Sequence, residues 1–151
     1  MAELLIVDDD RDAADALTAL LRARGHQVRW APDAGGALAQ IRHDPPDLVL
    51  LDLGLPRVFG LDLLDAMRDE PSLAPVAVAV YTGHDDPATR ARAARLGACG
   101  FIAKGRPLQA IWADIETCLT RRQSGVNGPP VPAQPAVPVP DPATAQQAFA
   151  G

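Results

Sequence analysis

The chain has 151 residues, of which 48% are hydrophobic and 22% are charged, and its formal net charge at pH 7 is −5. This composition is typical of one globular domain and excludes a fully disordered chain. The acidic balance argues against direct DNA binding, and no apolar run approaches the roughly 20 residues of a membrane span. No basic segment of a signal peptide precedes Asp8, and the two cysteines form no CxxC pair, so we expect a cytoplasmic protein without a disulfide framework or structural zinc.

The C-terminal part of the chain differs in composition from the rest. Seven of the 15 prolines lie in the range 129–142, and Asp141 is the only charged residue after position 122. A Pro-, Ala- and Val-rich segment without hydrophobic periodicity is typical of an extended tail. The sequence therefore predicts a folded domain over residues 1–122 and a Pro/Ala-rich, disordered tail over residues 123–151.

Strand and helix patterns alternate along the predicted domain. Short apolar runs predict buried strands over residues 4–7, 48–51 and 76–81, and residues 27–30 and 99–103 are weaker strand candidates. Amphipathic spacing with suitable start and stop residues predicts helices over residues 12–24, 34–42, 61–68, 87–96 and 107–121. Five strand–helix units predict an α/β fold with a five-stranded, doubly wound parallel sheet, the flavodoxin-like (βα)5 architecture.

Polar residues follow four of these strands directly. Asp8 and Asp9 follow the first strand, Asp52 follows the third, Thr82 the fourth and Lys104 the fifth. Because the carboxyl ends of parallel strands meet at one edge, we expect these side chains to converge there. Clustered carboxylates repel one another, and a hard divalent cation such as Mg²⁺ relieves that repulsion. Lys104 is also the only lysine beside 13 arginines, which draws attention to its place among the carboxylates.

Four segments resemble the receiver domain of bacterial two-component response regulators. They comprise the first strand with its acidic residues, the third strand with its following loop, the segment after the fourth strand, and the fifth strand. Their sequences are LIVDDD (5–10), DLVLLDLGLP (47–56), YTGHDD (81–86) and LGACGFIAK (96–104). The resemblance extends over residues 3–121 with the family's order and spacing. Because the 29-residue tail is too short for a second globular domain, we expect a receiver of the stand-alone, single-domain type.

The resemblance implies a phosphoryl-transfer site at the predicted strand ends. Asp52 would accept a phosphoryl group from a phosphohistidine of a sensor histidine kinase or a histidine phosphotransfer protein. Asp9, Asp52 and the backbone carbonyl of Gly54 would ligate Mg²⁺, and Asp8 would hold the ion through water. The family's chemistry is limited to its own phosphorylation and dephosphorylation, so the chain is not expected to be an enzyme.

The resemblance also implies a switch that acts on a protein-binding face. Thr82 and Lys104 would contact phosphoryl oxygens, and Phe101 would rotate to couple the site to the fourth helix, fifth strand and fifth helix. We expect that face to bind an unknown downstream protein. Gly105 stands where the family usually has a proline after a cis bond, and we expect a trans bond here because a cis bond before another residue costs about 2.5–4 kcal/mol.

Three functional alternatives are weighed against the same residues. A phosphorylation-independent adaptor would keep the fold with a vestigial site; the complete polar set argues against it, whereas Gly105 leaves it open. A phosphatase of the haloacid dehalogenase type needs a second aspartate two residues after its nucleophile, where this chain has Gly54. A nucleotide binder would need a glycine-rich loop after the first strand, which is missing. His26 and His43 show no partner pattern and are interpreted as surface residues.

Overall fold

The structure is a computed structural model that describes residues 1–83 and 85–123. The remainder of the predicted tail, residues 124–151, lies outside the described residues. The strands are β1 (Glu3–Val7), β2 (Gln27–Ala31), β3 (Leu48–Leu51), β4 (Val78–Thr82) and β5 (Gly100–Ala103). The helices are α1 (Arg11–Ala23), α2 (Ala34–His43), α3 (Gly60–Asp69), α4 (Pro87–Arg95) and α5 (Leu108–Gln123). None of the described helices has the length and apolar character needed to cross a membrane.

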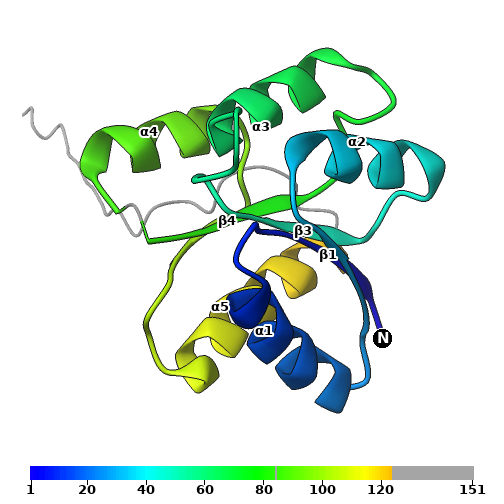
Figure 1. Ribbon diagram of the computed structural model, residues 1–151, viewed down its shortest axis with the longest axis vertical. Coiled ribbons are helices and arrows are strands. Elements are labelled where there is room, and N and C mark those ends of the chain that lie inside the picture. Colours follow the sequence, from blue (N-terminus) through cyan, green and yellow to red (C-terminus); the bar gives the residue numbers. More distant parts are fainter. Residues whose placement is uncertain (84, 124–151) are drawn as a thin grey trace, which may run out of the picture.

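The five strands form one parallel sheet with the order β2-β1-β3-β4-β5. Figure 1 shows α1 and α5 on one face of this sheet and α2, α3 and α4 on the other. The predicted α/β fold is therefore confirmed. The order reverses between β1 and β3, and such a reversal opens a crevice at the carboxyl ends of the strands in doubly wound sheets.

Two hydrophobic layers explain why the strands are continuously apolar. Leu5 and Val7 of β1 pack toward α2, α3 and α4, whereas Leu4 and Ile6 pack toward α1 and α5. All four side chains are completely buried. Because both faces of a doubly wound sheet are covered by helices, every position of the central strands β3 and β4 is buried, whereas the edge strand β2 begins with an exposed Gln27.

The predicted boundaries are wrong in places, chiefly around β4. The apolar run at 76–81 was expected to be all strand, but β4 covers Val78–Thr82. The amide of Val76 instead donates to Leu73 O at 3.0 Å, in the turn that follows α3. The hydrophobic pattern identifies buried residues, whereas hydrogen bonds of the turn decide where the strand begins.

Arg68 of α3 connects three elements that lie apart in the sequence. Its Nε donates to Leu96 O at 2.8 Å and its Nη2 to Gly97 O at 3.2 Å, both directly after α4. Its Nη1 donates to Ala74 O at 2.7 Å and to Val76 O at 2.9 Å, ahead of β4. Burial lowers the pKa of this guanidinium, and the four carbonyls compensate the lost hydration. Arg68 therefore holds α3 against the segments that enter β4 and β5.

We expect Arg68→Lys to lower the free energy of unfolding by about 2–4 kcal/mol, because a compact ammonium does not span both pairs of carbonyls. Urea denaturation measures this loss. Arg95→Lys, at an exposed position of α4, is the matched control and should cost less than about 0.5 kcal/mol. Equal losses for the two variants would contradict the connecting role of Arg68.

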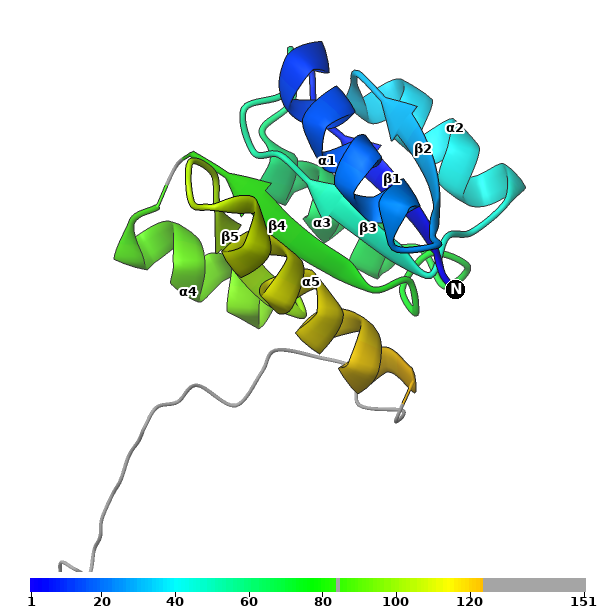
Figure 2. The same ribbon diagram turned by 90° about the horizontal axis from the view of Figure 1, so that it is seen from below.

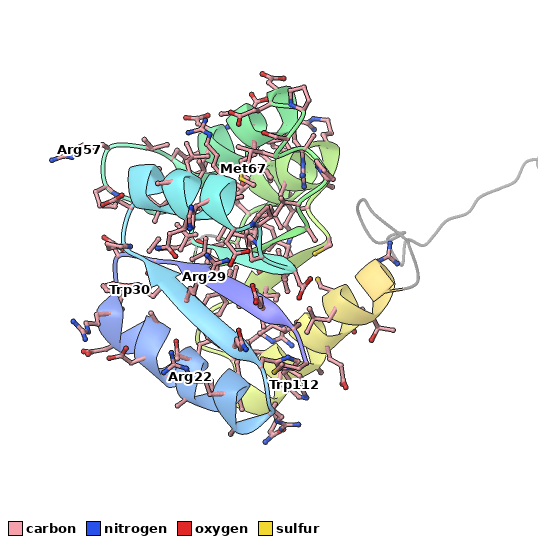
Figure 3. All side chains as sticks on the ribbon, turned by 90° about the vertical axis from the view of Figure 1, so that its right-hand side faces the viewer. Arg22, Arg29, Trp30, Arg57, Met67 and Trp112 are labelled. Atoms are coloured by element: carbon pink, nitrogen blue, oxygen red, sulfur yellow. The ribbon has the colours of Figure 1, made fainter. Side chains whose placement is uncertain are left out.

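His26 has partners, which corrects its interpretation as an unpartnered surface residue. Its Nδ1 accepts a hydrogen bond from the Ala2 amide at 3.0 Å, and its ring lies 5.5 Å from the Trp112 ring, centroid to centroid. The Arg24 guanidinium covers the same indole at 4.8 Å. Burial, followed by the charge of the N-terminus, lowers the pKa of His26. His43 is exposed, as expected. Figure 3 shows Trp112 on α5, in the layer that also contains α1.

We expect the stabilising contribution of His26 to be complete above its unfolded pKa of about 6.5 and to be lost as the pH falls below that value. The sign follows from the lowered pKa in the folded state, because protonating Nδ1 removes the acceptor for Ala2. Urea unfolding of the wild type and His26→Gln at pH 7.5, 6.5 and 5.5 measures this, and their difference should shrink with falling pH. His43→Gln is the control, and a pH-independent difference for His26→Gln would refute the linkage.

Candidate functional site

The strand register brings two aspartates to the same level of the sheet. Val7 of β1 lies opposite Leu51 of β3, so that Asp8 and Asp52 leave neighbouring strands together. The Asp52 amide donates to Val7 O at 2.9 Å, which extends this pairing by one residue. Both carboxylates are buried, with Asp8 at 0% and Asp52 at 7% exposure. The convergence predicted from the strand ends is therefore present for these two residues.

The register of β4 and β5 brings the other two predicted residues to the same edge. Thr82 is the last residue of β4, lies opposite Ala103 and is fully buried. The Lys104 amide donates to Thr82 O at 2.8 Å. Lys104 then directs its Nζ to Asp8 Oδ2 at 2.7 Å and to Asp52 Oδ2 at 3.5 Å. The four predicted site residues thus lie at one edge of the sheet, where Lys104 contacts both aspartates and is bonded through its backbone to Thr82.

Asp8, Asp9 and Asp52 form a carboxylate cluster in which one oxygen of each lies within 4.8 Å of the others. Asp9 is exposed, so the cluster opens to solvent on that side. Three carboxylates face the single ammonium of Lys104, and a divalent cation would balance the two formal negative charges that remain. Clustered carboxylate oxygens are hard ligands suited to Mg²⁺, so the residues present fit this ion.

Burial has opposite consequences for the two partners of the central ion pair. Burial raises the pKa of Asp8, against the hydrogen bond that this carboxylate accepts from Lys104. Burial also opposes the charge on Lys104, but the hydrogen bond to Asp8 and the attraction of Asp52 outweigh it and raise the pKa of Lys104. The ammonium of Lys104 thus stays charged, whereas burial disfavours the charged form of the Asp8 carboxylate. Added positive charge would relieve that cost.

The loop after β1 is held by hydrogen bonds that the sequence did not reveal. Trp30 Nε1 donates to Asp8 O at 2.8 Å, and the Asp10 amide donates to Asp8 Oδ1 at 2.9 Å. Asp10 in turn caps α1 by accepting from the Ala13 amide at 3.2 Å. Trp30 lies near the end of β2, where an indole is typical of a strand residue that packs against the core. The sequence pattern therefore does not indicate its hydrogen bond to the backbone of Asp8. Figure 3 shows Trp30 beside the start of α1.

The loop after Asp52 depends on a glycine. A Cβ at Gly60 would lie 2.5 Å from Asp52 O and 2.7 Å from Leu53 Cα, and the Gly60 amide donates to Leu53 O at 2.9 Å. Because Gly60 has no side chain, the start of α3 packs directly against the backbone that follows β3. The carbonyl of Gly54 remains a predicted ligand; Gly54 itself is exposed, between the buried side chains of Leu53 and Leu55. Arg57 in this loop has a φ of 69° and projects away from the domain in Figure 3.

Phe101 and Gly105 are the remaining predicted features on the β5 side. Phe101 is half-buried, and the Arg90 guanidinium covers its ring at 4.6 Å, so the ring faces α4. The described residues contain no cis peptide bond, as expected for the bond between Lys104 and Gly105. Gly105 itself has a φ of 86°, in the region that favours glycine. Glycine in place of the family's usual proline therefore fits this turn, because proline cannot adopt a positive φ.

A family model of the response regulator receiver domain matches residues 4–116. The chain belongs to the receiver domains of two-component response regulators. Receiver domains are signalling modules rather than enzymes that act on external substrates. The receiver-domain resemblance is thereby confirmed, together with its flavodoxin-like fold. The stand-alone, single-domain type stays a prediction.

The relatives and solved structures agree with this assignment. The chain is 35% identical to the response regulator protein PmrA of Pseudomonas aeruginosa, over 81% of this chain and 54% of that protein. It is 38% identical to the nitrogen assimilation regulatory protein NtrX of Azorhizobium caulinodans, over 68% of this chain and 22% of that protein. The chain thus spans about half or less of the length of these relatives.

Solved structures of receiver domains share the fold. A CheY-like receiver domain protein from Methanospirillum hungatei is similar with a TM-score of 0.75 and 27% identity, over 83% of this chain and 98% of that one. The non-phosphorylated HemR receiver domain from Leptospira biflexa has a TM-score of 0.74 and 28% identity, over 80% and 95% of the two chains.

We expect Mg²⁺ to change the fluorescence of Trp30, because this indole is hydrogen-bonded to the backbone of Asp8. The titration is made in a Trp112→Phe background, which leaves Trp30 as the only tryptophan. Asp9→Asn should weaken Mg²⁺ binding by at least about tenfold, because it removes one anionic oxygen ligand. Asp12→Asn, on the exposed first turn of α1, is the control, and equal affinities for the two variants would argue against the carboxylate cluster.

Proposed function

We propose that this receiver accepts a phosphoryl group on Asp52 from the phosphohistidine of a sensor histidine kinase or histidine phosphotransfer protein, with Mg²⁺ as cofactor. The observation that carries the proposal is the grouping of Asp52 with two further carboxylates and one ammonium. Phosphoryl transfer needs little covalent chemistry from a protein beyond a nucleophile, but it needs positioning and neutralisation of the transferred oxygens. This site offers each of those elements.

The nucleophile in this mechanism is a carboxylate oxygen of Asp52. This oxygen attacks the phosphorus opposite the P–N bond of the phosphohistidine. The P–N bond breaks, and the electron pair of that bond remains on the imidazole nitrogen of the donor. Asp9, Asp52 and the carbonyl of Gly54 would hold Mg²⁺, with Asp8 bound through water. When bound, the ion neutralises charge on the transferred oxygens. Lys104, 3.5 Å from Asp52, is close enough to pair with another of those oxygens.

The output of the switch would be a change at the face formed by α4, β5 and α5. Thr82 and Phe101 are on the adjacent strands β4 and β5, and the carbonyl of Thr82 accepts a hydrogen bond from the Lys104 amide. Phe101 is a wall of a groove of about 460 Å³ between α4, β5 and α5. Movement of Thr82 toward a phosphoryl oxygen would leave room for Phe101 to turn inward, which would alter that groove. A downstream protein that binds the groove would then sense the phosphoryl group, and the proposal involves no DNA contact by this domain.

The proposal predicts that acetyl phosphate and Mg²⁺ add the mass of one phosphoryl group to the full chain, as measured by intact-mass spectrometry. Asp52→Asn should abolish the added mass because it removes the nucleophile, and omission of Mg²⁺ should reduce it strongly. Lys104→Met should slow labelling by about 10²–10³-fold, the range for the loss of one charge-stabilising donor. Asp44→Asn, at an exposed aspartate after α2, is the control and should label like the wild type.

Two outcomes would contradict the phosphoryl-transfer proposal. Labelling that persists in Asp52→Asn would show that a residue other than Asp52 accepts the phosphoryl group. An unmodified wild type that nevertheless binds Mg²⁺ at the carboxylate cluster would favour the phosphorylation-independent adaptor. Beryllofluoride, followed by tryptophan fluorescence, distinguishes a site that binds a phosphoryl analogue from one that does not.

A further inference from the structure

The two cysteines of the chain lie together in the layer between the sheet and α5. Cys99 directly precedes β5, and Cys118 is on α5, 19 residues later in the sequence. Both thiols are free, with exposures of 6% and 2%, and both belong to the same hydrophobic cluster. Figure 2 shows α5 running across β5 and β4, which is the arrangement that joins them. Neither residue belongs to the phosphoryl-transfer site.

Gly100 makes the room in which the two sulfurs meet. A Cβ at this position would lie 2.8 Å from Cys118 Sγ, so this sulfur lies directly over the backbone next to Cys99. The thiol of Cys118 hydrogen-bonds to Cys99, which raises the pKa of Cys118 and lowers that of Cys99. The positive charge of Arg68 favours the Cys99 thiolate as well. With its sulfur over this backbone, Cys118 is placed to react with Cys99, and the surroundings favour the thiolate of Cys99.

The groove between α4, β5 and α5 gives small molecules access to this pair. Both cysteines line it, together with Phe101, Thr117 and the ion-pairing side chain of Asp114. Its volume of about 460 Å³ is ample for a molecule the size of a peroxide. The low exposure of the sulfurs excludes bulkier reactants such as another protein's cysteine. The geometry thus favours a reaction within the chain over one between chains.

We propose that Cys99 and Cys118 form a peroxide-sensitive dithiol whose oxidation to a disulfide crosslinks β5 to α5. The modification site lies at the start of β5, whereas Lys104 and the carboxylate cluster lie beyond its end. Both thiols also line the groove that includes Phe101. Oxidation would therefore act on the α4–β5–α5 face independently of phosphorylation and would hold α5 in place against the strand.

The chemistry balances with hydrogen peroxide as the oxidant. The Cys99 thiolate attacks one peroxide oxygen, the O–O bond breaks, and the leaving hydroxide takes a proton to become water, so that Cys99 becomes a sulfenic acid. The sulfur of Cys118 then attacks the sulfenic sulfur, the S–O bond breaks, and a second water leaves. Two thiols and one peroxide thus yield one disulfide and two waters, and peroxide receives two electrons.

The test treats the full native chain with hydrogen peroxide, quenches the reaction, unfolds the protein with an alkylating reagent present, and measures intact mass and peptides. We expect the wild type to lose two hydrogen atoms, to take up no alkyl group, and to give one crosslinked peptide pair that dithiothreitol separates. The oxidised monomer should also unfold at higher urea concentration than the reduced one, because the crosslink restricts the unfolded chain. This part of the test needs no variant.

Single variants then assign the two roles. In Cys118→Ser, Cys99 should stop at the sulfenic acid, which dimedone traps. In Cys99→Ser, Cys118 should remain alkylatable after the same treatment, because it is buried at 2% exposure and no second thiol is left to form the crosslink. Full alkylation of both cysteines in the peroxide-treated wild type would overturn the proposal. So would a disulfide-linked dimer, or oxidation of Cys99 to a sulfinic acid without a crosslink.

Discussion

The ion pair between Lys104 and Asp8 is the interaction on which the geometry of the site depends. Asp8 is fully buried, and a buried carboxylate is tolerated only when a charge partner and hydrogen bonds compensate its lost hydration. Lys104 provides the charge at 2.7 Å, and the Asp10 amide provides a hydrogen bond at 2.9 Å. Because Lys104 also lies 3.5 Å from Asp52, the same ammonium sets the spacing of the carboxylates from the first and third strands.

The surrounding fold keeps this charged group in place without filling its open side. Gly60 lets α3 approach the Asp52 backbone, and Trp30 fixes the carbonyl of Asp8. Arg68 holds the turn after α4 and the segment before β4, and so orients the strands that end in Thr82 and Lys104. Asp9 remains exposed, so that the cation and the phosphoryl donor of the proposed function would approach from solvent on this side. Backbone contacts thus hold the buried residues of the site, and Asp9 marks its open side.

The β5 strand connects two kinds of chemistry at its two ends. Lys104 follows the end of the strand beside the carboxylates, whereas Cys99 precedes its start beside α5. Phe101 lies between them, under Arg90, and contributes to the groove. A phosphoryl group on Asp52 and a disulfide at Cys99 would therefore act on one surface from opposite ends of the same strand. In the two proposals taken together, the α4–β5–α5 face would be the place where both inputs combine.

The sequence alone determined the fold class and the residues that meet at the site, because buried parallel strands are apolar throughout and end in polar residues at one edge. Asp8, Asp52, Thr82 and Lys104 were all found in this way. The tertiary structure decided what depends on contacts between distant segments: the bond from Trp30 to the Asp8 backbone, and the partners of His26. It also decided that Cys118 lies beside Cys99, since residues 19 apart become neighbours only when a helix packs back on its strand.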